Sequence, residues 1–216
     1  MKALDLHITD KCNLRCLYCS HGISKLENHS YYMSTKELQE IKNTIIDSER
    51  TRINVSGGEP TAHPEFEIFC NTLRQLFPNQ HLRLMSNGFK AELYKSVILN
   101  TFDSIVFTEY PSLQLSFSGW PTNIVDIHKV NHRSVYIPGT ANSTNCAFKV
   151  FPMVRNYKIY PCCRVFGLKL HLGEQPEDIG LPLKDYKNLA CDTLTCSKCW
   201  TQNFETVYKE TVSEKN

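Results

Sequence analysis

The stretch DKCNLRCLYCSHG, Asp10 to Gly22, places three cysteines close together behind the first apolar run of the chain. Three residues separate Cys12 from Cys16, and two residues separate Cys16 from Cys19. A disulfide needs two thiols, and a closed zinc site usually takes four ligands. Three thiolates leave one coordination position open, so the spacing predicts a metal centre with room for a further ligand.

The composition of the 216 residues favours a folded domain with its own core, because 41% of them are hydrophobic. The net charge is +2 without a basic stripe, so no nucleic-acid partner is expected. The chain has no apolar run long enough for a membrane span and no apolar export segment at its start. We therefore expect a cytoplasmic protein, in which the ten cysteines are thiols or metal ligands rather than disulfides.

Strands and helices alternate in the predicted pattern of the first 110 residues. Alternating apolar residues predict strands, and apolar residues at helical spacing predict helices. The expected strands fall within 3–9, 52–60, 81–88 and 102–111, of which the second ends in two glycines and the third in Asn-Gly, and the expected helices are at 34–47, 64–77 and 90–99. This order is typical of a parallel sheet with right-handed crossovers, so the fold class is α/β. Ligands gather at the carboxyl ends of such strands, so the loops there are expected to form one site.

The periodicity weakens after residue 110. The pattern predicts a short helix at 120–130, a strand at 133–139, and a β-hairpin around Arg155-Asn156 that is followed by a loop. A last helix is expected at 199–210. We place a domain boundary near residue 140, which divides the chain into residues 1–140 and 141–216.

The motif CNLRCLYC, with the aromatic Tyr18 before its last cysteine, resembles the signature of the radical SAM superfamily. The stretch SGGEP at 56–60 resembles the second motif of that superfamily. The resemblance implies a partial (β/α) barrel with a [4Fe–4S] cluster on Cys12, Cys16 and Cys19. It also implies that S-adenosylmethionine chelates the fourth iron and is cleaved reductively, so that a 5′-deoxyadenosyl radical abstracts hydrogen from a substrate.

The same resemblance assigns the remaining strand-end residues to S-adenosylmethionine. Glycines without side chains let backbone carbonyls approach the methionyl ammonium. The candidates are Gly57, Gly58 and Glu59 for the ammonium, Ser86 and Asn87 for the carboxylate or ribose, Thr108 and Glu109 for the ribose, and Tyr18 for the adenine. No general base is assigned, and His63, His128 and His132 receive no role.

A second cysteine group follows residue 140. A hairpin brings its ends together, so Cys146 and either Cys162 or Cys163 are expected to be near each other, and the CSKC pair supplies Cys196 and Cys199. This order resembles the twitch domain, a short form of the SPASM extension, as found in enzymes of the 2-deoxy-scyllo-inosamine dehydrogenase type. The resemblance implies a small hairpin-and-helix domain with a second, auxiliary [4Fe–4S] cluster. Cys191 is an extra thiol that leaves the ligand set open.

Zinc is the alternative at both cysteine groups. The first group would then be a zinc knuckle with His21 or His7 as the fourth ligand, and the second would be a zinc ribbon. Cys70 falls on the apolar face of a predicted helix and is interpreted as a buried structural thiol.

The function expected from these patterns is radical SAM chemistry on a small molecule, as a two-electron oxidation assisted by the auxiliary cluster. The expected partners are that substrate and a reducing protein such as flavodoxin or ferredoxin. A radical SAM enzyme that modifies a peptide is one alternative. A non-catalytic zinc-binding interaction protein is another, from a different class.

Overall fold

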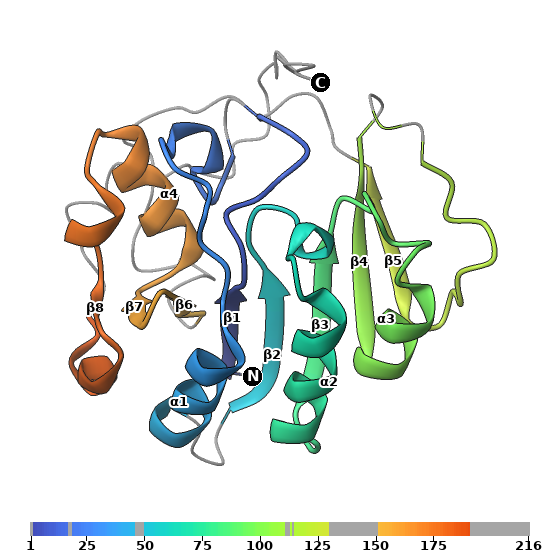
Figure 1. Cartoon of the computed structure of the whole chain (residues 1–216), viewed down its shortest axis with the longest axis horizontal. Coiled ribbons are helices and arrows are strands. Elements are labelled where there is room, and N and C mark those ends of the chain that lie inside the picture. Colours follow the sequence, from blue (N-terminus) through green and yellow to red (C-terminus); the bar gives the residue numbers. More distant parts are fainter. Residues whose placement is uncertain are drawn as a thin grey trace.

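The computed structural model describes residues 2–16, 19–45, 50–110, 113, 115–129 and 151–190. This part of the chain forms one eight-stranded sheet in the order β5-β4-β3-β2-β1-β6-β7-β8 (Figure 1). Its strands are β1 (Lys2–His7), β2 (Arg50–Ser56), β3 (His81–Ser86), β4 (Ser104–Glu109), β5 (Val125–Lys129), β6 (Met153–Arg155), β7 (Lys158–Tyr160) and β8 (Leu181–Pro182). Neighbours from β5 to β6 pair in parallel, and β7 and β8 add antiparallel pairs. The predicted α/β class and parallel sheet are confirmed.

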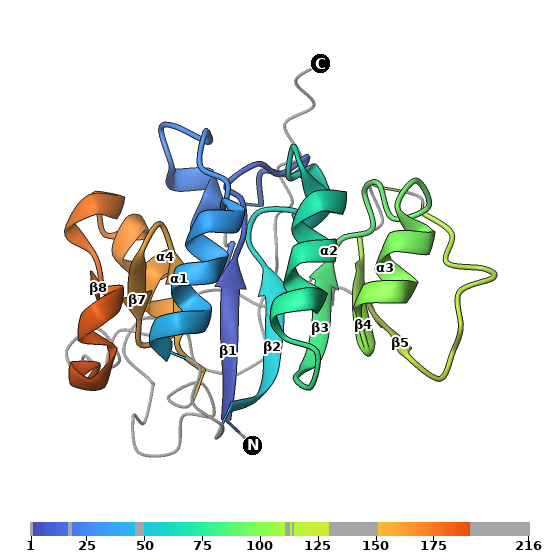
Figure 2. The ribbon, with the colours of Figure 1, turned by 60° about the horizontal axis from the view of Figure 1, so that its bottom comes forward.

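Helices α1 (Thr35–Ile45), α2 (Phe66–Leu76) and α3 (Lys95–Thr101) lie in a row over one face of the sheet (Figure 2). They bury the main core against the side chains that β1 directs toward them, Leu4 and Leu6. Helix α1 begins where the sequence predicts, because the Ser34 hydroxyl accepts a hydrogen bond of 3.1 Å from the Glu37 amide.

The opposite face of β1 is covered by α4 (Cys163–His171). The ring of His7, which alternates with Leu6 on the strand, lies 5.9 Å from the ring of Phe166. A second core cluster joins α4 to the hairpin strands through Met153 and Tyr160. None of the helices among the described residues has the length and apolar character that a membrane crossing requires.

Two secondary-structure predictions are wrong. The segment 120–130 contains the strand β5 instead of a helix, since Ile124, Val125 and Ile127 fit either spacing and pairing with the edge of β4 decides between them. The segment after the hairpin is the helix α4 instead of a loop. The third predicted helix also starts later than expected, at Lys95.

The predicted hairpin is formed by β6 and β7, but its turn is one residue further along the chain. Asn156 and Tyr157 have φ of +50° and +56°, the positive values that a two-residue type I′ turn requires at both central positions. Strand β6 pairs with β1, so the hairpin extends the sheet of the first part of the chain. The strand expected at 133–139, the boundary near 140 and the helix expected at 199–210 lie outside the described residues.

Candidate functional site

The loop after β1 brings the three leading cysteines together. None of Cys12, Cys16 and Cys19 is in a disulfide, and the Cys19 amide donates to the Cys16 carbonyl at 3.2 Å. Burial raises the pKa of the Cys12 thiol to about 12, and the neighbouring Glu59 carboxylate and the two other thiols add to the rise. Three thiols that influence one another in a partly buried loop are a donor set that fits an iron–sulfur cluster.

The glycines of the SGGEP motif hold the base of this loop. The Gly58 amide donates to the Thr9 carbonyl at 2.7 Å, and the Glu59 amide donates to the Lys11 carbonyl at 2.8 Å. A Cβ on Gly58 would lie 2.3 Å from the Lys11 carbonyl oxygen, and one on Gly57 would lie 2.6 Å from that of Thr9. Both glycines are therefore required by the close approach of two backbone segments, whatever else they contact.

Glu59 joins the loops that follow β2 and β3. Its buried carboxylate accepts hydrogen bonds of 2.7 Å from the hydroxyls of Thr61 and Ser86 and of 2.7 Å from the Asn87 amide. Burial raises the pKa of Glu59, against the effect of these hydrogen bonds. The side-chain nitrogen of Asn87, Nδ2, donates to Asn13 Oδ1 at 2.8 Å and lies 3.9 Å from Cys12 Sγ. The structure thus brings three of the predicted loops to one place.

Thr108 and Glu109 end β4 at the same edge and pair in register with His128 and Lys129 of β5. Glu109 lines an open groove of about 480 Å³ together with the segment around Phe117. Their contact with the ribose remains a prediction. Tyr18 and the rear cysteines Cys146, Cys191, Cys196 and Cys199 lie outside the described residues.

The two adjacent rear cysteines lie at the start of α4, where Cys162 is the N-cap and Cys163 is the first helical residue. Both are buried. Cys163 packs in the cluster of Tyr160 and Phe166, whereas Cys162 packs with Val165. Burial raises the pKa of Cys163 well above its usual value, and the Asp5 carboxylate adds to the rise. An auxiliary cluster on these residues remains a prediction.

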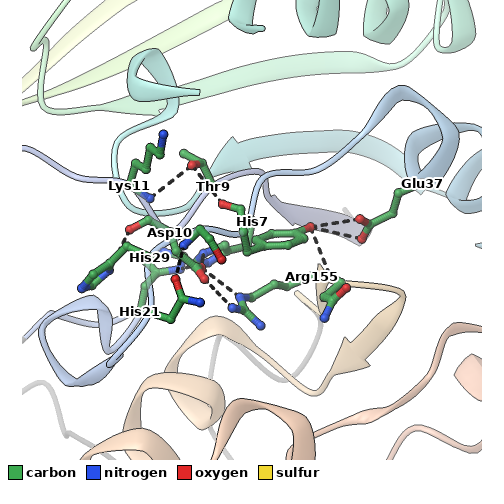
Figure 3. Close-up of polar contacts among 12 residues, drawn as sticks. His7, Thr9, Asp10, Lys11, His21, His29, Glu37 and Arg155 are labelled. Carbon is green, nitrogen blue, oxygen red and sulfur yellow. Dashed lines mark hydrogen bonds and ion pairs between the residues drawn. The ribbon is translucent and has the colours of Figure 1, made fainter. Parts of the chain in front are cut away.

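A buried polar network behind the cysteine loop was missed by sequence reasoning. Asp10 accepts a bidentate pair of hydrogen bonds from Arg155 and a hydrogen bond of 2.8 Å from His7 Nε2 (Figure 3). Burial alone would raise the pKa of Asp10, but the hydrogen bonds from His7 and Arg155 outweigh it and lower the pKa to about 2. The sequence hints at this network only through Asp10, a charged residue two positions before Cys12. Its partner Arg155 comes from the distant hairpin, which no local pattern connects with Asp10.

The zinc-knuckle alternative gains no support from these positions. The second His7 nitrogen, Nδ1, lies 3.2 Å from Nδ1 of His21, so the two rings are hydrogen-bonded to each other. Burial lowers the pKa of His21 to about 3, and the neighbouring His7 contributes. Within the described part of the chain, no three His, Cys, Asp or Glu side chains are arranged around a single metal ion.

Comparisons with known proteins agree with this geometry. Residues 6–108 match the family model described as the radical SAM superfamily. The GTP 3′,8-cyclase of Actinobacillus pleuropneumoniae serotype 3 (strain JL03) is 32% identical over 90 residues, which are 41% of this chain and 26% of that protein. A probable GTP 3′,8-cyclase of Methanococcus maripaludis (strain DSM 14266) is 25% identical over 193 residues, 81% of this chain and 59% of that protein. The chain therefore spans between about a quarter and three fifths of the length of these relatives.

The fold also matches a solved structure over nearly its whole length. The crystal structure of BtrN in complex with AdoMet and 2-DOIA superposes with a TM-score of 0.65 at 15% identity, covering 98% of both chains. At this identity the likeness concerns the fold alone. The sequence match to the radical SAM superfamily thus concerns residues 6–108, the part of the chain that carries both strand-end motifs.

Proposed function

We propose that this protein is a radical SAM enzyme that oxidises a small molecule by two electrons with the help of an auxiliary [4Fe–4S] cluster. The observation that carries the proposal is the convergence of Cys12, Cys16 and Cys19 beside Glu59 and Asn87 at the carboxyl edge of the sheet. Three thiolates fit a [4Fe–4S] cluster that keeps one iron open to a cofactor.

The proposal gives a role to each group of residues at the carboxyl edge of the sheet. Cys12, Cys16 and Cys19 would hold the first cluster. When bound, that cluster supplies the electron that cleaves S-adenosylmethionine into a hydrogen-abstracting radical. The residues of the chain orient the cofactor and exclude water: the buried carboxyl group of Glu59 ties the loop after β2 to the loop after β3, and Asn87 links its loop to the cysteine loop through Asn13.

The fold shared with BtrN is consistent with a small substrate such as a sugar, cyclitol or nucleotide. The match extends over 98% of both chains and includes a complex with the small molecule 2-DOIA. A second candidate, cyclisation of GTP, is supported by the names of the curated relatives. Modification of a peptide is a third possibility, but the names of the similar proteins given above do not support it.

Iron content and cofactor cleavage test the proposal. Protein purified without oxygen is expected to be brown and to hold about eight irons per chain, as two four-iron clusters require. After reduction it should convert S-adenosylmethionine to 5′-deoxyadenosine. Cys16→Ala is expected to abolish this cleavage, whereas Cys196→Ala should keep about four irons and some uncoupled cleavage while losing product.

The outcomes separate the candidates. Deuterium that moves from a labelled polyol substrate into 5′-deoxyadenosine, with a ketone as the product, supports the oxidation. A cyclised nucleotide formed from GTP supports the second candidate. Colourless protein with stoichiometric zinc and no cofactor cleavage would overturn both and favour the interaction protein.

A further inference from the structure

The ion pair between Asp10 and Arg155 joins two parts of the chain that are 145 residues apart. Asp10 lies two residues before Cys12, and Arg155 is the last residue of β6. Arg155 Nε donates to one carboxylate oxygen at 2.9 Å and its terminal nitrogen donates to the other. The side chains are 0% and 6% exposed, so this is a buried, two-point contact.

Arg155 is itself held rigidly. Its guanidinium lies 4.7 Å from the ring centre of Tyr31 and 5.2 Å from that of Phe166. The hairpin turn that follows it is fixed by two further hydrogen bonds, because the Asn156 amide donates to the Tyr31 hydroxyl at 3.0 Å and the Tyr157 amide donates to Glu37 at 2.9 Å. The guanidinium therefore presents its two donors in a fixed place (Figure 3).

The contact continues from Asp10 to the other end of the cysteine loop. His7 donates to Asp10 with one nitrogen and shares a hydrogen bond of 3.2 Å with His21 through the other. His21 lies two residues after Cys19. A single chain of buried and partly buried contacts thus runs from the hairpin to the residues that flank the first and the last cysteine.

We infer that Arg155 is a positioning residue, which sets the conformation of the cysteine loop through Asp10 and His7. The effect of this positioning on cofactor binding depends on the proposed function. Without the guanidinium, Asp10 would lose its two-point partner and keep His7 as its remaining side-chain partner, and removing one partner of a buried ion pair is strongly destabilising. The backbone that leads into Cys12 would then lose its anchor to the hairpin.

Hydrogen exchange of the full, reduced chain without added iron tests the inference. In Arg155→Met, peptides covering residues 8–16 and 19–31 are expected to exchange at least about tenfold faster than in the wild type, which corresponds to ~1.4 kcal/mol of local opening. Arg155→Lys keeps the charge but loses the two-point geometry, so a smaller acceleration is expected in the same peptides. Peptides from β2 and β3 should be unchanged.

Arg74→Met is the control for loss of an arginine–aspartate pair elsewhere in the sheet, although this pair is more exposed than Asp10–Arg155. Arg74 also pairs with an aspartate, Asp103, at 2.9 Å, but at the amino end of β4, far along the strand from the cysteine loop. Its substitution should accelerate exchange around 78–82 and 101–104 and leave the cysteine loop unchanged. An unchanged loop in both Arg155 variants, or an equal acceleration over the whole sheet, would overturn the inference. Arg155→Lys keeps the test decisive if Arg155→Met does not fold.

A second measurement uses the iron-loaded protein. With iron content equal to the wild type, Arg155→Lys is expected to weaken the change that S-adenosylmethionine causes in the electron paramagnetic resonance spectrum of the reduced cluster, whereas Arg74→Met is not. A spectrum and cofactor response identical to the wild type would contradict a positioning role. If the wild type takes up no iron, the proposed function fails, but the exchange experiment still decides about Arg155.

Discussion

Replacing Glu37 by glutamine should stabilise the protein above neutral pH. The carboxylate of Glu37 lies on α1 and is only 2% exposed. It accepts hydrogen bonds from the Tyr31 hydroxyl at 3.1 Å and from the Tyr157 amide at 2.9 Å. Burial nevertheless raises the pKa of Glu37 from 4.5 to about 7, because these hydrogen bonds and the charge of Arg155 do not offset the loss of water.

The direction of the pH dependence follows from that rise. The folded state holds its proton more tightly than the unfolded state, so the stability gained is fully present below pH 4.5 and is lost as the pH rises through about 7. At 1.36 kcal/mol per pKa unit, the total loss is about 3 kcal/mol. Glutamine has the same shape and stays neutral. The advantage of Glu37→Gln should therefore grow from under ~1 kcal/mol at pH 5 to ~3 kcal/mol at pH 8.5.

Urea unfolding followed by circular dichroism between pH 5 and pH 8.5 measures this difference. In thermal unfolding, ~3 kcal/mol corresponds to roughly 6–12 °C for a chain of this size. Glu40→Gln, an exposed position on the same helix, is the matched control and should change stability little at any pH. A Glu37→Gln advantage that does not depend on pH, or a wild type that is the more stable protein at pH 8.5, would refute the reasoning.

Two further substitutions test the packing of the site and the core. Gly58→Ala places a methyl group 2.3 Å from the Lys11 carbonyl oxygen and should cost about 1–3 kcal/mol of stability and lower the iron content, measured by urea unfolding and iron analysis. Gly173→Ala, which meets no atom within 4 Å but has a φ of +88°, controls for backbone strain alone and should keep its iron. Cys70→Ala in the buried face of α2 should cost about 1 kcal/mol and leave iron content unchanged; an iron loss there would show that Cys70 is not merely structural.

Local patterns predicted the first half of the fold. Alternation identified β1 to β4, and the serine at position 34 correctly marked the start of α1. Glu37 lies three residues after Ser34, the spacing of a capping box, in which the glutamate side chain bonds within its own first helical turn. Its carboxylate instead contacts residues 31 and 157, and no local rule specifies a partner 120 residues away.

Helix α4 was missed for a reason of the same kind. It contains Gly167, which lowers helix propensity. In the structure this glycine is required, because a Cβ there would lie 2.2 Å from the carbonyl oxygen of Ser20. The residue that makes the helix hard to predict is the one that lets α4 approach the cysteine loop, and that requirement exists only in the folded chain.

The cysteine loop shows what a sequence motif can and cannot predict. Apart from the bridge between Thr9 and Tyr32, its described residues, 8–16 and 19–22, belong to no strand or helix, so its shape depends on contacts with distant segments. Gly58 and Glu59 hold its base from the loop after β2, the Met33 amide donates to the Ile8 carbonyl from the other flank at 2.8 Å, and Arg155 holds Asp10 from the hairpin. A glycine motif beside such a loop is needed to let two backbones meet even before a cofactor arrives. Matching the motif in sequence therefore predicts the loop and its thiols well, while the residues that touch the cofactor have to be found by measuring binding in variants that leave this backbone contact intact.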